Sequence, residues 1–99
     1  MEAKNADPTV EFVLTLFVSG ASPNSVRAIN NLEKILKNHV DGRYELNIVD
    51  VRQEKDTAEK EQIIALPLLI KRFPQPERRL IGDMSDTKKV LSGLGIPVD

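Results

Sequence analysis

The pattern of apolar and polar positions predicts alternating strands and helices in the first half of the chain. Residues 11–18 are so rich in apolar side chains that both faces of an extended strand would be mostly hydrophobic, which is typical of a central strand covered on both sides. From Val26 to Val40 the apolar residues recur at three- and four-residue spacing, which predicts a helix with one buried face. Residues 43–51 then predict a second strand. This first half is therefore expected to be a βαβ unit with parallel strands.

The second half gives weaker patterns. Residues 55–64 predict a short and mostly charged helix, and residues 66–73 predict a strand. Pro67 must lie at the start or edge of that strand, because proline cannot donate a hydrogen bond to a neighbouring strand. Residues 78–83 predict a fourth strand that pairs back on the third as a hairpin. A last helix is expected after it.

The ends of the two longer helices carry recognisable capping residues. Ser22 suits the N-cap of the first helix, and Pro23 suits its first helical position. Ser85 or Asp86 can cap the last helix, and Gly95 can end it, because glycine readily adopts the left-handed conformation found after a helix. These signals predict where the helices begin and end.

The predicted order is βαβαββα, which is the order of the thioredoxin fold. We therefore expect one α/β, thioredoxin-like domain over residues 1–99, with residues 1–9 as a flexible polar leader. Pro67 follows the second predicted helix directly, as the cis-proline of that fold does. We therefore predict a cis bond before Pro67, although such bonds are a small minority of X-Pro bonds.

Local preferences do not commit the region after Arg52 to one arrangement. Its predicted helices are short, and short isolated helices are marginal in water. Ile63 and Ile64 favour strands, yet they close a predicted helix. Gly93 and Gly95 weaken any regular element in which they stand. The second half is therefore harder to predict than the first.

Composition excludes several classes of function. The 99 residues carry a net charge of −1 and no cysteine. Near-neutral charge argues against a nucleic-acid binder that relies on bulk positive charge. The missing cysteines exclude disulfides, thiol redox chemistry and thiolate metal sites. No apolar run approaches the length of a membrane span, and the leader lacks a signal-peptide core, so we expect a cytoplasmic protein without membrane contact.

No pattern predicts an active site. Ser22 and Ser25 have the spacing of a Cys-x-x-Cys motif, but a serine is no nucleophile without an activating base. We therefore interpret Ser22 as the helix cap and Ser25 as a residue of the first helical turn. His39 is the only histidine, and one histidine cannot build a multi-histidine metal site. A group of carboxylates matches no calcium loop and reads as a solvated face: Asp50, Glu54, Asp56, Glu59 and Glu61. We expect no enzyme activity, cofactor or metal.

A basic strip flanks the predicted hairpin turn, and it consists of Lys71, Arg72, Arg78 and Arg79. One interpretation is a docking surface for an acidic partner. The other is charge that protects an edge strand from aggregation. The residues alone do not choose between the two.

Four blocks of sequence resemble the KaiB family of clock proteins and its bacterial relatives. The first is "VSGASPNSVRAINNLEKIL", where the family carries a V-A-G-x-T-P-N-S-x-R-A type segment. The others are "LNIVDV", "IIALPLLIKRFPQPERRLIGDMSD" and "KVLSGLGI", in the same order as in the family. The resemblance covers roughly residues 11–96. In the first block the matching residues are Gly20, Pro23, Asn24, Ser25, Arg27 and Ala28.

The resemblance implies a non-enzymatic regulatory protein. KaiB proteins bind the N-terminal ATPase domain of the ring-shaped ATPase and kinase KaiC, recruit KaiA and displace the histidine kinase SasA, whose sensor domain is a more distant relative. The family also has two folds. A tetrameric ground state has the order βαββααβ, and a thioredoxin-like monomer binds KaiC. The resemblance thus implies a KaiC-type partner, a KaiA or SasA-type pathway, and a homo-oligomer, dimer or tetramer.

The chain departs from the family at several positions. Lysines that help the family to meet KaiC are replaced by Asn47 and Gln62, and a family Asp is replaced by Gly95. The chain also ends at Asp99, before the family's C-terminal "LLYxEL" segment, which belongs to the ground-state fold. These departures predict the thioredoxin-like state. They also leave open an alternative function, in which the protein no longer binds KaiC and acts in stress adaptation through another partner.

The resemblance and the charge pattern together predict two sets of functional residues, one for partner binding and one for the choice of fold state. For partner binding they are Arg27, Asn31, Asn47, Gln62, Lys71, Arg78 and Arg79. For the choice of fold state they are Pro67, Gly93 and Gly95.

Overall fold

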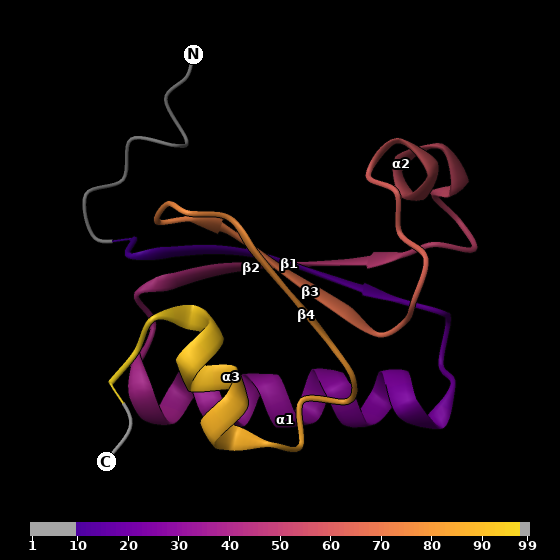
Figure 1. Ribbon diagram of the computed structural model, residues 1–99. Coiled ribbons are helices and arrows are strands. Elements are labelled where there is room, and N and C mark those ends of the chain that lie inside the picture. Colours follow the sequence, from indigo (N-terminus) through magenta and orange to yellow (C-terminus); the bar gives the residue numbers. More distant parts are fainter. Residues whose placement is uncertain (1–9, 98–99) are drawn as a thin grey trace.

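The secondary structure follows the predicted order βαβαββα (Figure 1). The structure is a computed structural model, and it describes residues 10–97. The predicted leader, residues 1–9, lies outside these residues. The elements are β1 (Phe12–Val18), α1 (Pro23–His39), β2 (Tyr44–Asp50), α2 (Lys55–Lys60), β3 (Leu68–Phe73), β4 (Arg78–Ile81) and α3 (Thr87–Leu94).

The four strands form one mixed sheet in the order β2-β1-β3-β4. β1 pairs with β2 in parallel and with β3 antiparallel, and β3 pairs with β4 as an antiparallel hairpin. β1 is therefore an inner strand, and most of its side chains are buried on both faces. The predicted βαβ unit, central strand and hairpin are all confirmed.

The helices divide between the two faces of the sheet. α1 and α3 cover one face, whereas α2 lies on the other face near one end of the sheet (Figure 1). The main core lies between the sheet and the helix pair, where Leu14 and Leu16 of β1 meet Leu32 and Leu36 of α1. A smaller cluster around Phe17 lies on the α2 side. Much of that second face is left without a covering helix.

Local chemistry explains where the two longer helices begin and end. Ser22 Oγ accepts a hydrogen bond from Ser25 N at 3.3 Å, and Pro23 takes the first position of α1, as predicted. For α3, Asp86 rather than Ser85 provides the cap, because its Oδ1 accepts from Lys89 N at 3.1 Å. α3 ends at Gly95 in the left-handed conformation, with φ of 80°.

α2 is shorter than predicted. The pattern indicated a helix over residues 55–64, but the helix ends at Lys60. Gln62 adopts a left-handed φ of 57°, and its N–H donates to Glu59 O at 3.1 Å. The N–H of Ile63 reaches back to Ala58 O at 3.0 Å, which completes a Schellman ending. The helix stops there because Ile63 packs against the small cluster on the sheet.

Pro67 stands immediately before β3, and its peptide bond is cis, as predicted. The bonds before Pro74 and Pro76 are also cis, which the sequence did not predict. Pro67 is buried, and its carbonyl accepts from Gly82 N at 3.0 Å. Residues 52–97 thus adopt the thioredoxin arrangement rather than the ground-state order. Within residues 10–97, no helix is long and apolar enough to cross a membrane.

Candidate protein-docking surface

The serine pair at the β1–α1 junction serves the backbone of the loop. Ser22 Oγ donates to Ser25 Oγ at 2.8 Å, and Ser25 Oγ accepts from Ser19 N at 3.0 Å. Ser25 is buried. Among the described residues, neither hydroxyl hydrogen bonds to a histidine or a carboxylate, so neither has an activating base. The geometry is that of a helix cap, as the sequence predicted.

Asp50, at the end of β2, ties this junction to the sheet. Its Oδ1 accepts from Gly20 N at 3.0 Å and from Arg52 N at 2.9 Å. These two backbone hydrogen bonds, with that from Arg52 the larger, hold the pKa of the Asp50 carboxyl below its ordinary value. Gly20 has a φ of 56°, and a Cβ there would overlap with the Arg52 guanidinium. The exposed Arg52 side chain could move aside, so it is the left-handed backbone that favours glycine at this position.

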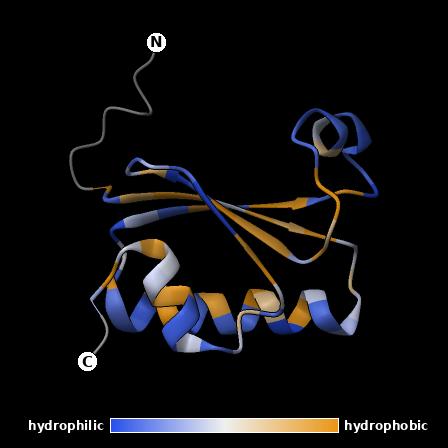
Figure 2. Cartoon of the chain, in the orientation of Figure 1, coloured by the Kyte–Doolittle hydropathy of each residue, from blue (hydrophilic) through white to orange (hydrophobic). Residues whose placement is uncertain are grey.

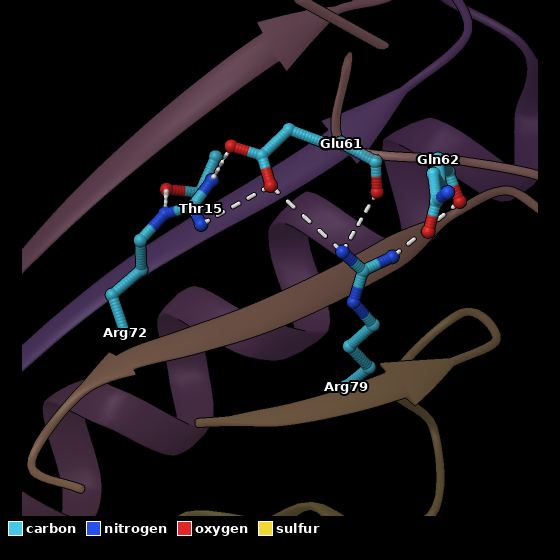
Figure 3. Close-up of polar contacts among 5 residues, drawn as sticks. All are labelled: Thr15, Glu61, Gln62, Arg72 and Arg79. Carbon is cyan, nitrogen blue, oxygen red and sulfur yellow. Dashed lines mark hydrogen bonds and ion pairs between the residues drawn. The ribbon is translucent and has the colours of Figure 1, made fainter. Parts of the chain in front are cut away.

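Glu61 connects the end of α2 to the sheet (Figure 3). Its carboxylate forms an ion pair with Arg72 of β3 at 3.1 Å and a longer one with Arg79 of β4 at 3.8 Å. Arg72 Nε also donates to Thr15 Oγ1 of β1 at 3.2 Å. Arg79 donates to the carbonyl oxygens of Glu61 and Gln62 at 2.7 and 3.5 Å. This network fastens α2 across three strands.

The predicted basic strip is not one surface. Successive strand residues face opposite sides of the sheet, so Arg72 and Arg79 lie on the α2 side, where they pair with Glu61. Lys71 points to the other side, toward α3, and is only 5% exposed. Arg78 pairs with Lys71 across the hairpin but is exposed. The expectation of Lys71 in a docking surface is therefore corrected: it belongs to the interior.

Arg27 and Asn31 also have intramolecular roles. Both lie on α1 and hold the loop between β4 and α3. Arg27 Nε contacts Asp83 Oδ2 at 3.3 Å, and Asn31 Nδ2 donates to Asp83 O at 2.9 Å. The pKa of Asp83 is lowered chiefly by the hydroxyl and N–H of Ser85, and then by Arg27. Asn31 is half-buried by this contact, so it is less available to a partner than predicted.

The remaining candidates lie apart from one another. Asn47 is exposed on the edge strand β2, where its Nδ2 donates to Glu45 Oε2 at 3.1 Å. Gln62 is exposed beyond the end of α2. Gly93 lies on α3, where an added Cβ would stand 2.6 Å from the side chain of Leu80. The predicted partner-binding residues therefore do not gather into one site.

Three exposed aliphatic side chains around the start of β3 and the end of β4 were not predicted from the sequence. Ile64 is 94% exposed, Ile81 57% and Leu66 37%, and we call these three residues the apolar loop patch. Ile81 lies opposite Leu68 in the sheet, and Gly82 N binds Pro67 O. Figure 2 shows the hydrophobic connection from α2 to β3. Grouped exposed aliphatic residues mark protein-contact sites.

The end of α2 provided the sequence signal for this patch. Two adjacent isoleucines follow a charged helix, and of these only Ile63 packs against the smaller cluster, where it is partly buried. No group of three or more histidine, cysteine or carboxylate residues in the described part of the chain could hold a metal ion. The arrangement offers a surface for protein contact.

Comparison with known proteins decides the family. The sequence model of the KaiB domain family matches residues 15–96 of this chain. The chain belongs to the KaiB family. It is 47% identical over 88 residues to the circadian clock oscillator protein KaiB of Prochlorococcus marinus subsp. pastoris, covering 89% of this chain and 82% of that protein. It is 45% identical over 89 residues to the circadian clock oscillator protein KaiB of Synechococcus elongatus, and the match covers 90% of this chain and 87% of that protein. The family prediction is confirmed.

Solved structures confirm the thioredoxin-like fold of this KaiB-family chain. The N-terminal domain of Synechococcus elongatus SasA superposes with a TM-score of 0.71 at 20% identity, covering 87% of this chain and 85% of that domain. Fasciola hepatica thioredoxin superposes with a TM-score of 0.70 at 18% identity, and the match covers 93% of this chain and 86% of the thioredoxin. At these identities the likeness concerns the fold alone.

Proposed function

We propose that this KaiB-family chain is a non-enzymatic clock-type regulator that docks on the N-terminal ATPase domain of a KaiC-type ring and modulates its phosphorylation state. Family membership supports this proposal, because the curated relatives are circadian clock oscillator proteins. The SasA domain shares the thioredoxin-like fold of this chain. A SasA-type kinase would then compete for the same ring surface, and a KaiA-type protein would join the complex.

The observation that carries the proposal is the apolar loop patch. Ile64 extends almost fully into solvent, beside the end of α2 and next to Gln62. Glu61 and its two arginine partners fasten that end to the sheet, so the patch stands on a supported base. Complete burial of one such side chain contributes about 1.5–3 kcal/mol. A few aliphatic side chains on a preorganised base can therefore anchor a protein interface.

Size-exclusion chromatography with an ATP-loaded KaiC homologue tests the proposal. We expect a complex to form when the KaiB-family chain is present at roughly tens of micromolar. The Asn47→Lys, Gln62→Lys double variant restores the two family lysines, and it should bind at least as tightly as the wild type. Failure of both proteins to form a complex would contradict docking on a KaiC-type ring.

Asn47 and Gln62 favour a second candidate function. Both are exposed and uncharged where the family carries lysine. In this alternative the protein has lost KaiC binding and acts in stress adaptation through another protein partner. An affinity capture from the source cell that returns one reproducible protein other than KaiC, with no ring complex, would favour it.

We also propose that the chain retains the family's second fold as a minor state. The thioredoxin-like arrangement is favoured by Gly95, whose left-handed conformation ends α3 without the strain that an aspartate would bring. Chains in the ground-state fold would form the dimers or tetramers that the resemblance to the family implies. Two sets of amide signals in slow exchange would reveal the minor state.

A further inference from the structure

α2 ends earlier than its own residues favour. The residue pattern favours a helix over residues 55–64, but the helix ends at Lys60. Gln62 takes a left-handed φ of 57°, which costs energy for a residue with a Cβ. The N–H of Ile63 then reaches back to Ala58 O at 3.0 Å and closes the turn. Contacts from outside the helix must therefore favour this ending.

Arg79 of β4 supplies such contacts (Figure 3). Its guanidinium donates to Glu61 O at 2.7 Å and to Gln62 O at 3.5 Å. If α2 continued, these two carbonyls would accept the N–H groups of Ala65 and Leu66, because helical hydrogen bonds join residues four apart. Arg79 therefore occupies the acceptors that a longer helix would use, as basic side chains do at helix C-termini.

The ending of α2 decides which of two adjacent isoleucines enters the interior. Ile63 packs against the smaller cluster and is partly buried, whereas Ile64 is 94% exposed. Neighbouring residues of a helix point about 100° apart, so a helix that continued would redirect both side chains. Arg79 lies opposite Ile70 in the sheet, and Ile70 is a fully buried member of the same cluster. Arg79 thus acts beside the place that Ile63 fills.

We propose that Arg79 is a positioning residue that sets which isoleucine the chain presents to a partner. With its guanidinium in place, Ile63 fills the cluster and Ile64 stands in the apolar loop patch. Without it, the segment after α2 exchanges with an arrangement in which the helix continues and Ile64 takes the interior place of Ile63. The consequence for ring binding rests on the docking function proposed above, whereas the exchange of side chains does not.

Thiol labelling measures the exposure of each position without a partner, because the chain has no cysteine of its own. Ile64→Cys should react with a maleimide about tenfold faster than Ile63→Cys in an otherwise unchanged chain. Arg79→Met keeps the aliphatic stem and removes every donor. It should slow Ile64→Cys about twofold and speed Ile63→Cys about fivefold, as equal populations of the two arrangements require. Arg79→Lys should shift both rates in the same directions, because it lacks the planar fork of donors.

The slower reaction of Ile64→Cys distinguishes an exchange of side chains from a general loosening. A loop that only frays speeds Ile63→Cys and leaves Ile64→Cys at its full rate, and that result would overturn the proposal. Unchanged rates at both positions would also overturn it. Arg78→Met is the matched control, because this neighbouring side chain faces the other side of the sheet. It should leave both rates unchanged.

Gln62→Gly provides a rescue that a general loss of stability would not allow. Glycine takes the left-handed conformation without strain, so in the Arg79→Met background it should recover at least about half of each change in rate. Gln62→Ala removes the same side chain but keeps the Cβ, and it should recover none. Equal effects of the two substitutions would contradict a role of the left-handed ending.

Titration of an ATP-loaded KaiC-type ring measures the consequence for docking. If Ile64 is presented only half of the time, Arg79→Met should weaken binding about twofold. Weaker binding without a change in labelling would indicate a direct contact of Arg79 with the ring and would overturn the positioning role. A wild type that does not bind the ring would contradict the docking function, whereas the labelling rates would still decide what Arg79 does.

Discussion

At the scale of single residues, the Asp50 carboxylate supports the β1–α1 junction by accepting backbone hydrogen bonds. One carboxylate oxygen accepts the N–H groups of Gly20 and Arg52. The ionised form is therefore favoured in the folded protein, which lowers the Asp50 pKa. The residue thus links the end of β2 to the loop that precedes α1, and its charge state contributes to stability.

The pH dependence of unfolding follows from this shift. Because the pKa is lower in the folded state, the stabilisation is complete above the ordinary value of 3.8 and is lost as the pH falls through the folded-state pKa. Asp50→Asn should flatten this acid limb and lower the stability at neutral pH. Urea unfolding over a pH series measures both. Parallel curves for variant and wild type would show that Asp50 contributes no pH dependence.

Gly95 gives a second prediction at this scale. Its φ of 80° is left-handed, and it ends α3 with hydrogen bonds from its own N–H and that of Ile96. Gly95→Ala should destabilise the thioredoxin-like state by about 1 kcal/mol, because a Cβ is strained in this conformation. Ser92→Ala, at an exposed site on the same helix, is the control. Equal urea midpoints for the two variants would argue against the strain.

At the scale of elements, α2 depends on contacts beyond the helix itself. It has six residues, none of them buried, and a helix of that length is unstable alone. Its support comes from Ile63, which packs on the sheet, and from Glu61 between two arginines. α2 is therefore the element that we expect to open most readily.

Glu61→Ala should increase hydrogen exchange in α2 and leave α1 unaffected. The charged hydrogen bonds of Glu61 are partly shielded, with about a third of each side chain exposed. Their loss should cost roughly 1 kcal/mol of local stability. Glu59→Ala, at the penultimate residue of the same helix, serves as the control. Unchanged exchange in α2 would show that the Glu61 network does not fasten the helix.

Sequence patterns predicted those helices and strands whose position is determined by residues close together in the chain. Ser22 and Pro23 mark the start of α1, and the apolar spacing marks its length. The end of α2 was missed because it depends on Ile63 packing against distant strands. The roles of Arg27 and Asn31 were missed because Asp83 lies more than fifty residues away. Long-range contacts of this kind leave no local signal.

The error at the basic strip has a different cause. Lys71 and Arg72 are adjacent in sequence, yet a strand turns their side chains to opposite faces. Strand alternation alone would have separated them. Exposure of Ile64 could not be predicted in this way, because either of two adjacent isoleucines could have filled the interior.

At the scale of the whole molecule, the apolar loop patch lies at the α2 end of the sheet. The main core lies on the other face of the sheet, between the strands and the helices α1 and α3 (Figure 1). Substitutions at the patch can therefore test docking on a ring without disturbing the main core.

Titration of an ATP-loaded KaiC-type ring with wild type, Ile64→Asp and Phe73→Asp tests the central claim most directly. Phe73 is also exposed and apolar, but it lies at the opposite end of β3 from the patch. We predict that Ile64→Asp weakens binding about tenfold or more, because it places a charge in a buried contact, and that Phe73→Asp binds like wild type. Equal binding by all three proteins, or no binding by wild type, would contradict docking through the apolar loop patch.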